Sequence, residues 1–190
     1  MLELAKLLLQ RSLADRDGQH RTYSLLLDMN QIFESYICRL LQRLQTPTRR
    51  VQLQASGKSL LLQNGKKRFL LRPDAVVYES GQCETVLDTK WKQLDPDAWN
   101  HGIKQSDIYQ MYAYTREYNS RRTILLYPRS SIFKQAAGGP EDNSIIHLPL
   151  GIYHFPPNGD PEPALEIHAI DIACNNREVL RQLSQIINLV

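Results

Sequence analysis

Charged residues interrupt two apolar, strand-like segments of this chain and limit how those segments can fold. The segments are residues 69–78 (FLLRPDAVVY) and 83–91 (CETVLDTKW), and the residues between them, 79–82 (ESGQ), have turn chemistry. This pattern predicts a β-hairpin. Aspartate is a poor strand former, so Asp74 and Asp88 in the middle of such segments indicate a specific role.

The apolar neighbours of these charges favour a buried sheet. For an isolated Asp-x-Lys motif, a surface hairpin with solvated charges is the alternative. Here the flanking residues are mostly Leu, Val and Ala, and unpaired charge in such a setting is costly. Buried charges are usually paired or bind a metal, so Asp74, Asp88 and Lys90 outline a site for a metal and water.

The alternation of side chains along strands decides whether these charges meet. Asp88 and Lys90 share a face of their strand, with Thr89 opposite. Asp74 lies on the same face only if the sequence numbers of two residues that pair across the hairpin have an even sum, as 74 and 88 do. A regular two- or four-residue loop gives an odd sum. We therefore predict either a three-residue loop, 80–82, with a positive φ in it, or a bulge near Pro73.

Two helices are expected to flank the hairpin. Asp28 caps the first helix, which runs to about Gln45 and carries Glu34 at the edge of its apolar face. The second helix covers residues 105–118. It places Gln110 and Tyr114 four residues apart, so that they stack on one face, and packing of that face on the sheet is their alternative role.

The remaining pattern predicts an α/β fold, with a mixed β-sheet flanked by helices. Asn64-Gly65 between two strand-like segments indicates a type I′ hairpin. Other expected elements are a helix at 1–13, strands at 51–55, 60–63, 123–127, 144–148, 152–155 and 165–170, and a helix at 176–189.

Length and composition indicate a single domain of 190 residues. We expect an N-terminal helix and connector at 1–22, a core at 25–128, and C-terminal strands and a helix at 129–190. No segment reaches the roughly 18 apolar residues of a membrane span, so no membrane partner is expected. An odd number of cysteines without metal-ligand spacing favours a reduced, cytoplasmic protein; these are Cys38, Cys83 and Cys174. The five histidines, His20, His101, His147, His154 and His168, show no zinc pattern.

Basic charge is concentrated in one stretch of the chain. Residues 46–73 hold seven Lys or Arg residues and no acidic residue, whereas residues 139–171 hold six acidic residues and no Lys or Arg. Such a basic stretch suits a polyanion such as DNA, although a solvated loop is the alternative. The candidate DNA-binding residues are Lys66, Lys67, Arg68, Arg72, Lys92 and Tyr114.

The order of these motifs resembles a known superfamily. Glu34 on a first helix, then RPD at 72–74, VLDTK at 86–90 and QMYAY at 110–114, is similar to the PD-(D/E)xK nucleases. LDMNQIFE at 27–34 and the QMYAY run resemble McrC, the nuclease subunit of the modification-dependent McrBC restriction systems. The resemblance covers about residues 25–128 and implies a restriction-endonuclease-like core.

The resemblance implies a Mg²⁺-dependent DNA endonuclease, with Mn²⁺ as a substitute metal. Asp74, Asp88 and the backbone carbonyl of Thr89 are the expected ligands, because Mg²⁺ prefers hard oxygen ligands. Lys90 is expected to orient or deprotonate the attacking water. Glu34 adds a ligand directly or through water. Gln110 positions the lysine, the water or the phosphate, with Tyr114 as its neighbour.

The resemblance also implies partners. The substrate is expected to be double-stranded, modified DNA. The chain has no P-loop glycine pattern, so nucleotide hydrolysis is expected from a GTP-hydrolysing AAA+ motor of the McrB type. McrC proteins carry a motor-binding region before the nuclease, and here little precedes it, so the chain looks like a C-terminal portion or a shortened relative. A dimer or larger assembly stays open, as do another PD-(D/E)xK nuclease, of repair or transposon type, and a catalytically silent DNA-binding or assembly module.

Overall fold

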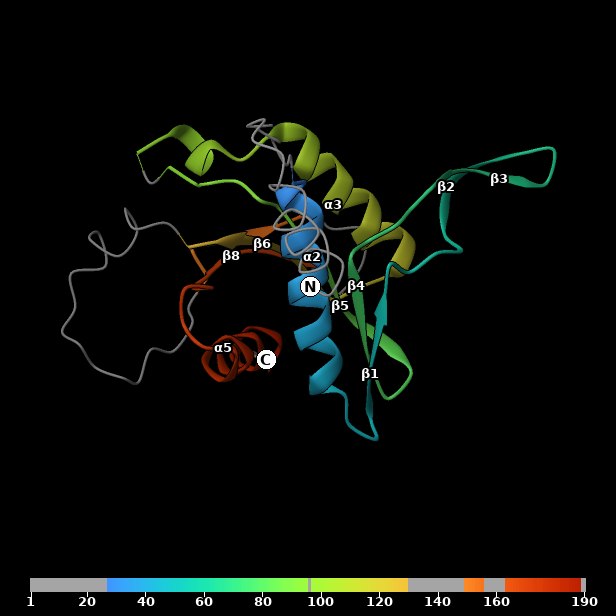
Figure 1. The fold of residues 1–190 in the computed structure, drawn as a ribbon. Helices are drawn as coiled ribbons and strands as arrows, with labels where there is room; N and C mark the ends of the chain where they lie inside the picture. The colour runs from blue at the N-terminus through green and yellow to red at the C-terminus, as the bar shows by residue number, and fades with distance from the viewer. Residues whose placement is uncertain (1–26, 96, 130–148, 156–162, 189–190) are drawn as a thin grey trace, which may run out of the picture.

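A six-stranded mixed sheet forms the centre of the protein (Figure 1). The computed structural model describes residues 27–95, 97–129, 149–155 and 163–188. In spatial order the strands are β1 (Arg49–Leu53), β4 (Ala75–Glu79), β5 (Gln82–Thr89), β6 (Arg122–Pro128), β8 (Ala164–Ile170) and β7 (Gly151–His154). β5, β6 and β8 run parallel, and the other neighbours pair antiparallel. This arrangement, with helices on both faces, confirms the predicted α/β fold.

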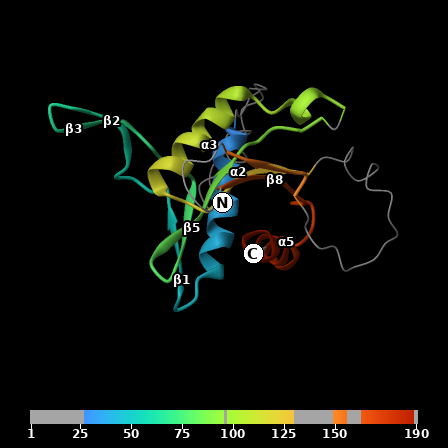
Figure 2. The ribbon, with the colours of Figure 1, turned by 180° about the vertical axis from the view of Figure 1, so that it is seen from behind.

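Helices cover the two faces of the sheet unequally (Figures 1 and 2). α2 (Met29–Leu41), continued by a 3₁₀ turn at Gln42–Leu44, and α5 (Asn176–Asn188) pack on one face; α3 (Gln105–Tyr118) packs on the other. The predicted cap of α2 is confirmed, because the Asp28 carboxylate accepts hydrogen bonds from the N–H groups of Asn30 and Gln31 at 3.0 and 3.4 Å.

Strict alternation along β5 produces two separate apolar cores. Leu87 lies in the core beneath α2 and α5, whereas its neighbour Val86 lies in the core beneath α3. The same alternation in β6 sends Ile124 to the first core and Leu125 to the second. By this rule Asp88, two residues after Val86, faces α3.

The predicted strand at 69–78 is in fact two strands that belong to different sheets. Among the described residues β3 (Lys66–Leu70) pairs with β2 (Ser59–Gln63) alone, and this hairpin projects away from the main sheet, as both ribbon views show. Phe69 takes a left-handed φ of 54°, and Pro73 has no N–H for a sheet ladder, so the chain breaks before β4 begins. Asp74 therefore precedes the strand rather than lying inside it.

The turn between β2 and β3 has the predicted type I′ conformation. Asn64 and Gly65 both have positive φ values, 51° and 73°, which this turn requires. The hairpin it closes is exposed along residues 60–70.

The β4–β5 hairpin reaches the required register by a device that we did not predict. Its loop has only two residues, Ser80 and Gly81, with φ of 50° and 83°. Next to this turn the sequence numbers of paired residues have an odd sum, as for Tyr78 and Cys83. From the pair Val77 and Thr85 onward the sum is even. The change comes from one extra residue in β5, Glu84. The predicted three-residue loop and the predicted bulge near Pro73 are both wrong, whereas the even sum next to Asp74 is present.

Other boundaries shift by one to four residues from those expected. β1 begins at Arg49 rather than at residue 51, and α2 ends as an α-helix at Leu41. The expected helix at 1–13, its connector and the strand at 144–148 lie outside the described residues. Within the described ranges, no helix has the length and apolar character needed to cross a membrane.

Candidate active site

Asp88 lies at the carboxyl end of β5, a strand in the middle of the sheet. Its side chain is buried, with 3% of the residue exposed, between the neighbouring strands β4 and β6. Oδ2 of Asp88 lies 2.6 Å from Nζ of Lys90, the first residue after the strand, but makes no hydrogen bond of regular geometry. A buried carboxylate oxygen with only one close cation has room in its coordination for a metal.

Asp74 is fixed against the end of the same strand. Its Oδ2 accepts hydrogen bonds from both the N–H and the hydroxyl of Thr89, each at 2.7 Å. The side chain of Thr89 thus serves to hold Asp74. On the other side, the carbonyl of Asp74 accepts from the N–H of Gln54 at 2.8 Å and from the thiol of Cys38 at 3.5 Å. These contacts hold the Asp74 backbone and one carboxylate oxygen in place.

The two carboxylates affect each other electrostatically. Burial and the charge of Asp88 raise the pKa of Asp74 to about 7, although the two bonds from Thr89 act in the opposite direction. Burial also raises the pKa of Asp88, and Lys90 lowers it in part. Tyr114 on α3 has a raised pKa too, from burial and then from the nearby charges of Asp88 and Asp74. Both carboxylates therefore lie near α3, as the even register requires.

A chain of hydrogen bonds extends from the lysine into α3. Nζ of Lys90 donates to Oε1 of Gln110 at 3.0 Å, and Nε2 of Gln110 donates to the hydroxyl of Tyr114 at 2.7 Å. Tyr114 also hydrogen-bonds the backbone of Arg72. The predicted pair on α3 thus meets Lys90, and Lys90 is held between Asp88 and Gln110.

Glu34 lies near the pair of carboxylates without joining them. It is half-buried on α2, its Oε1 accepts from Nε2 of Gln54 at 2.9 Å, and its charge contributes to the raised pKa values of Asp74 and Asp88. In the part of the chain that the structure describes, no three His, Cys, Asp or Glu side chains are placed to bind one metal. Glu34 therefore stays a prediction as a ligand through water.

The candidate DNA-binding residues fall in four places, one of which is Tyr114 on α3, a buried side chain that is 3% exposed. Lys66, Lys67 and Arg68 lie on β3, and Arg72 lies exposed between that strand and Asp74. Lys92 follows Lys90 by two residues, and its ammonium donates to the carbonyl of Gly102, so it closes a loop of its own chain.

Two further neighbours of the site, Asp107 and Asn30, were not among the predicted residues. Asp107 lies one turn before Gln110 on α3, and its charge contributes to raising the pKa of Asp88. Asn30 accepts a bond from the N–H of Trp91 at 3.2 Å and so ties α2 to the residue after Lys90. The spacing of three residues between Asp107 and Gln110 was the available signal for the first.

The histidines of the described residues have other surroundings. His168 is buried and its Nε2 lies 2.8 Å from Glu166, His154 is exposed, and His101 lies in the loop after the active site. His20 and His147 lie outside the described residues. The cysteines Cys38, Cys83 and Cys174 are free thiols.

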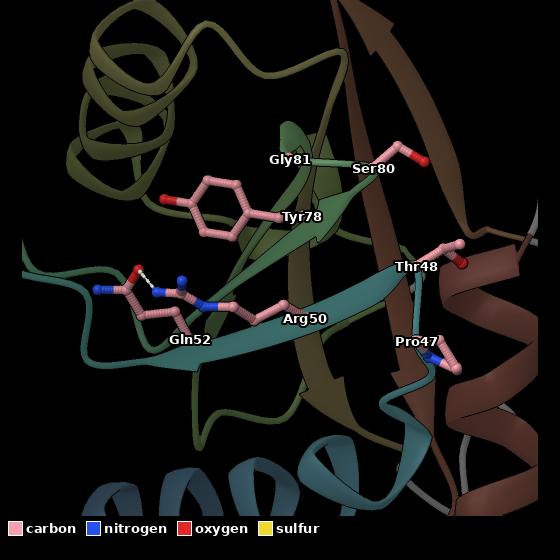
Figure 3. A pocket seen from close by; sticks show the side chains of 7 residues that line it. All are labelled: Pro47, Thr48, Arg50, Gln52, Tyr78, Ser80 and Gly81. Carbon is pink, nitrogen blue, oxygen red and sulfur yellow. Dashed lines mark hydrogen bonds between the residues drawn. The ribbon is translucent and has the colours of Figure 1, made fainter.

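A hollow of about 590 Å³ lies at the other end of the β4–β5 hairpin, beside its turn (Figure 3). The guanidinium of Arg50 lies 5.7 Å from the ring centre of Tyr78 and donates to Gln52 at 3.2 Å. None of the candidate catalytic residues lines this hollow, which lies a strand length away from Asp74. We take the carboxylate pair as the candidate site, because it brings together two acidic side chains with raised pKa values.

The donor set of the carboxylate pair fits a hard divalent cation. Mg²⁺ is usually bound by one or two carboxylates and keeps several waters. Asp74 uses Oδ2 for both bonds from Thr89, which leaves Oδ1 as its ligand atom, and Asp88 contributes its buried carboxylate. A cation here would also relieve the repulsion between the two carboxylates.

Comparison with known proteins identifies the family. Residues 1–128 match the family described as McrBC 5-methylcytosine restriction system component. The chain belongs to this family. The match begins before the residues on which the resemblance was noticed and ends at the same residue, Pro128, and it contains every candidate site residue. It confirms the predicted McrC-type resemblance.

A solved structure with a similar fold comes from the same kind of system. It is a half-complex from a tetradecameric assembly of Thermococcus gammatolerans McrB AAA+ hexamers with bound McrC, at 20% identity and a TM-score of 0.52. The alignment covers 86% of the McrBC-family chain described here and 34% of the other chain, so this chain spans about a third of that length. At this identity the likeness concerns the fold. Comparison with curated proteins found no match.

Proposed function

We propose that this McrBC-family chain is a Mg²⁺-dependent endonuclease that hydrolyses phosphodiester bonds of DNA. The observation that carries the proposal is the pair of half-buried Asp74 and buried Asp88, whose carboxylates have raised pKa values, next to Lys90, whose Nζ lies 2.6 Å from Asp88 Oδ2. Such a pair is unfavourable for the fold alone, so a role in binding a cation accounts for it.

The residues divide the reaction between them. When bound, Mg²⁺ relieves charge on the phosphate and makes water a better nucleophile. Asp74 and Asp88 would hold it, with the Thr89 carbonyl as a third oxygen and Glu34 through water. Lys90 orients the attacking water or holds its proton, and the bond from Lys90 to Gln110 fixes its ammonium at that position. Mn²⁺ is expected to substitute, because it accepts the same oxygen ligands.

Modified double-stranded DNA is the proposed substrate, and a McrB-like AAA+ subunit is the proposed partner. The family description names a 5-methylcytosine restriction system, and the structural neighbour is an assembly of McrB hexamers with McrC. The sequence contains no P-loop of its own, which agrees with GTP hydrolysis by a partner. The three free thiols suit the reducing cytoplasm as the place of action.

Three alanine variants test the catalytic assignment. Asp74→Ala, Asp88→Ala and Lys90→Ala should each abolish plasmid nicking in Mg²⁺ or Mn²⁺, measured with and without a cognate GTPase, while circular dichroism shows an intact fold. Loss of a metal ligand or general base typically costs about 10²-fold or more in rate.

Two variants of exposed charges serve as controls. Asp97→Ala and Lys104→Ala remove one exposed acid and one exposed base and should cut at the wild-type rate. Wild-type cutting by any variant of the trio would contradict the assignment. A wild-type protein that binds DNA but never cuts it would favour the catalytically silent module.

A further inference from the structure

The hairpin of β2 and β3, residues 59–70, stands apart from the rest of the fold; we call it the arm. Its two strands form a sheet of their own, and the ribbon views show it projecting beyond the main sheet (Figures 1 and 2). Residues 60–70 are all exposed, including Leu62 at 70% and Phe69 at 69%. Apolar side chains this exposed in a group usually contact another molecule.

Both faces of the arm carry the same mixture of side chains. The pairing places Leu62 beside Lys67 on one face and Leu61 beside Arg68 on the other. A ribbon that packs on a protein surface has one apolar face and one polar face. The arm has apolar and basic residues on both, so the geometry suits a partner that surrounds it, such as a groove.

The charge of the arm indicates what lines this groove. Lys66, Lys67 and Arg68 are consecutive, and no acidic residue occurs from 46 to 73 to neutralise them. Arg68 is aligned along the ribbon by a 3.0 Å bond from its Nε to Gln63, a contact that leaves its two terminal nitrogens to meet an anion. Because basic residues lie on both faces of the arm, both walls of a matching groove would be negatively charged.

Duplex DNA provides such a groove. Its major groove, about 12 Å wide, accepts a two-stranded β-ribbon, and its walls are phosphate backbones. Leucine and phenylalanine side chains on the same ribbon can contact sugars and thymine methyl groups. Their presence together with the three basic residues distinguishes the arm from an ordinary solvated loop.

The arm is anchored next to the proposed metal ligands. At its base, the N–H of Leu71 donates to the carbonyl of Lys58 at 3.0 Å, and the N–H of Gln54 donates to the carbonyl of Asp74 at 2.8 Å. Only residues 71–73 separate β3 from Asp74, so the Cα atoms of Leu70 and Asp74 are at most about 14 Å apart. Since one strand of DNA has a phosphate every 3.4 Å or so, the base of the arm lies within roughly four nucleotides of the reacting phosphate.

We propose that the arm enters the groove of duplex DNA beside the scissile bond and fixes the path of the substrate across Asp74 and Asp88. This inference rests on the proposed function, since it names the element that holds the proposed substrate. The basic residues of the arm supply affinity but do not recognise a base sequence. The family description names a modified base, 5-methylcytosine, and no base sequence.

Binding without cleavage tests the arm directly. The full chain is titrated in EDTA against a 30-base-pair duplex and against one of its strands, over a range of salt concentrations. Lys66→Gln/Lys67→Gln/Arg68→Gln should weaken duplex binding at least tenfold at low salt and reduce the slope of log K against log salt by about 2–3. Leu62→Ser/Phe69→Ser should weaken duplex binding without changing the salt slope or the binding of the single strand.

A matched variant controls for net charge. Arg39→Gln/Arg43→Gln/Arg177→Gln removes three exposed charges outside the arm and should keep the wild-type slope. Because neither cutting nor metal is involved, arm-dependent binding by a protein that never cuts would sustain this inference and refute the catalysis. Normal cutting by the arm variant, with an unchanged slope of log K against log salt, would refute the role of the arm and leave the proposed catalysis standing. An arm variant that binds DNA normally but no longer associates with the AAA+ partner would show a protein-docking arm and also overturn it.

Discussion

Asp74 combines a secure hydrogen-bonded position with an unfavourable charge. Thr89 donates two bonds to one carboxylate oxygen, which favours ionisation, but burial and Asp88 outweigh them and bring the pKa to about 7. The ordinary value for an aspartate is near 4. The folded protein therefore binds a proton at Asp74 between about pH 4 and pH 7, where the unfolded chain does not.

This difference fixes the sign of a pH effect on stability. Because the folded state holds more protons over that range, the free energy of unfolding without metal should fall as the pH rises from about 4 to about 7. A divalent cation binds the ionised form and should reduce this fall. The measurement is the melting temperature across pH in EDTA and in Mg²⁺.

The amide variant of this residue gives the matching test. Asp74→Asn keeps an acceptor for Thr89 and removes the charge, so at pH 8 in EDTA its Tm should exceed that of the wild type by about 2–4 °C, equivalent to about 1 kcal/mol. The difference should disappear at pH 4. If the variant melts below the wild type at pH 8 without metal, the charge of Asp74 stabilises the sheet, contrary to this prediction.

At the scale of the elements, the β4–β5 hairpin reconciles a tight turn with the position of the active site. The two-residue turn at Ser80-Gly81 sets an odd register, and the extra residue Glu84 converts it to the even register that puts Asp74 and Asp88 on one face. A bulge costs one pairing position and increases the local twist. Its position between Val77 and Tyr78 leaves the pairing next to Asp74 regular.

Deleting Glu84 tests this interpretation of the hairpin. Cys83 and Thr85 already pair with neighbouring residues of β4, so a chain without Glu84 can form a regular ladder with Asp74 still opposite Asp88. We expect the deletion variant to keep its cutting rate within about threefold, a change of less than 1 kcal/mol in activation free energy.

A second deletion provides the contrast. Removing Val86 instead shifts Asp88 by one position toward the other face, and this variant should lose cutting altogether. Loss of cutting in the Glu84 deletion, with the circular dichroism spectrum unchanged, would mean that the twist of the bulge, and not the register alone, shapes the site.

At the scale of the whole molecule, a buried ion pair joins elements that lie far apart in the sequence. Arg122 on β6 donates two hydrogen bonds of 2.7 Å to Glu166 on β8. It also donates to two carbonyls near the end of α5, that of Ile186 at 2.9 Å and that of Ile187 at 3.3 Å. Burial would raise the pKa of Glu166, but the bonds from Arg122 and His168 lower it to about 2. The cluster ties the C-terminal helix to the parallel strands.

Breaking this pair should destabilise the fold far from the active site. Arg122→Met leaves Glu166 buried without its cation and the C-terminal end of α5 without this donor, so we expect a loss of about 3–5 kcal/mol in the free energy of unfolding. The double variant Arg122→Met/Glu166→Met should recover part of that loss. Urea denaturation at pH 7 measures both, and DNA cutting by the folded fraction should be unchanged. Equal losses in the single and double variants would contradict the account.

The same pair has its own pH dependence, opposite in sign to that of Asp74. The pKa of Glu166 is lowered in the folded state, so its contribution is present above about pH 4.5 and is lost as the pH falls toward 2. The difference in unfolding free energy between the wild type and the Arg122→Met variant should therefore shrink as the pH falls from about 4.5 toward 2.

Several features of this protein were determined by the sequence over a few residues. The cap at Asp28, the positive φ values at Asn64-Gly65 and the common face of Asp88 and Lys90 depend on local side-chain and backbone preferences. The motif order was enough to indicate the family, and the parity of residues 74 and 88 was enough to require an even register. These features need no knowledge of distant contacts.

The tertiary structure alone decided which segments pair and which stay exposed. Local propensity could not show that 69–78 splits between two sheets, that Glu84 supplies the bulge, or that the leucines of the arm stay uncovered. Nor could it match Arg122 with Glu166, 44 residues away. Such outcomes depend on the total burial and hydrogen bonding of competing arrangements, in which differences of a few kcal/mol summed over the whole molecule select one register and one partner.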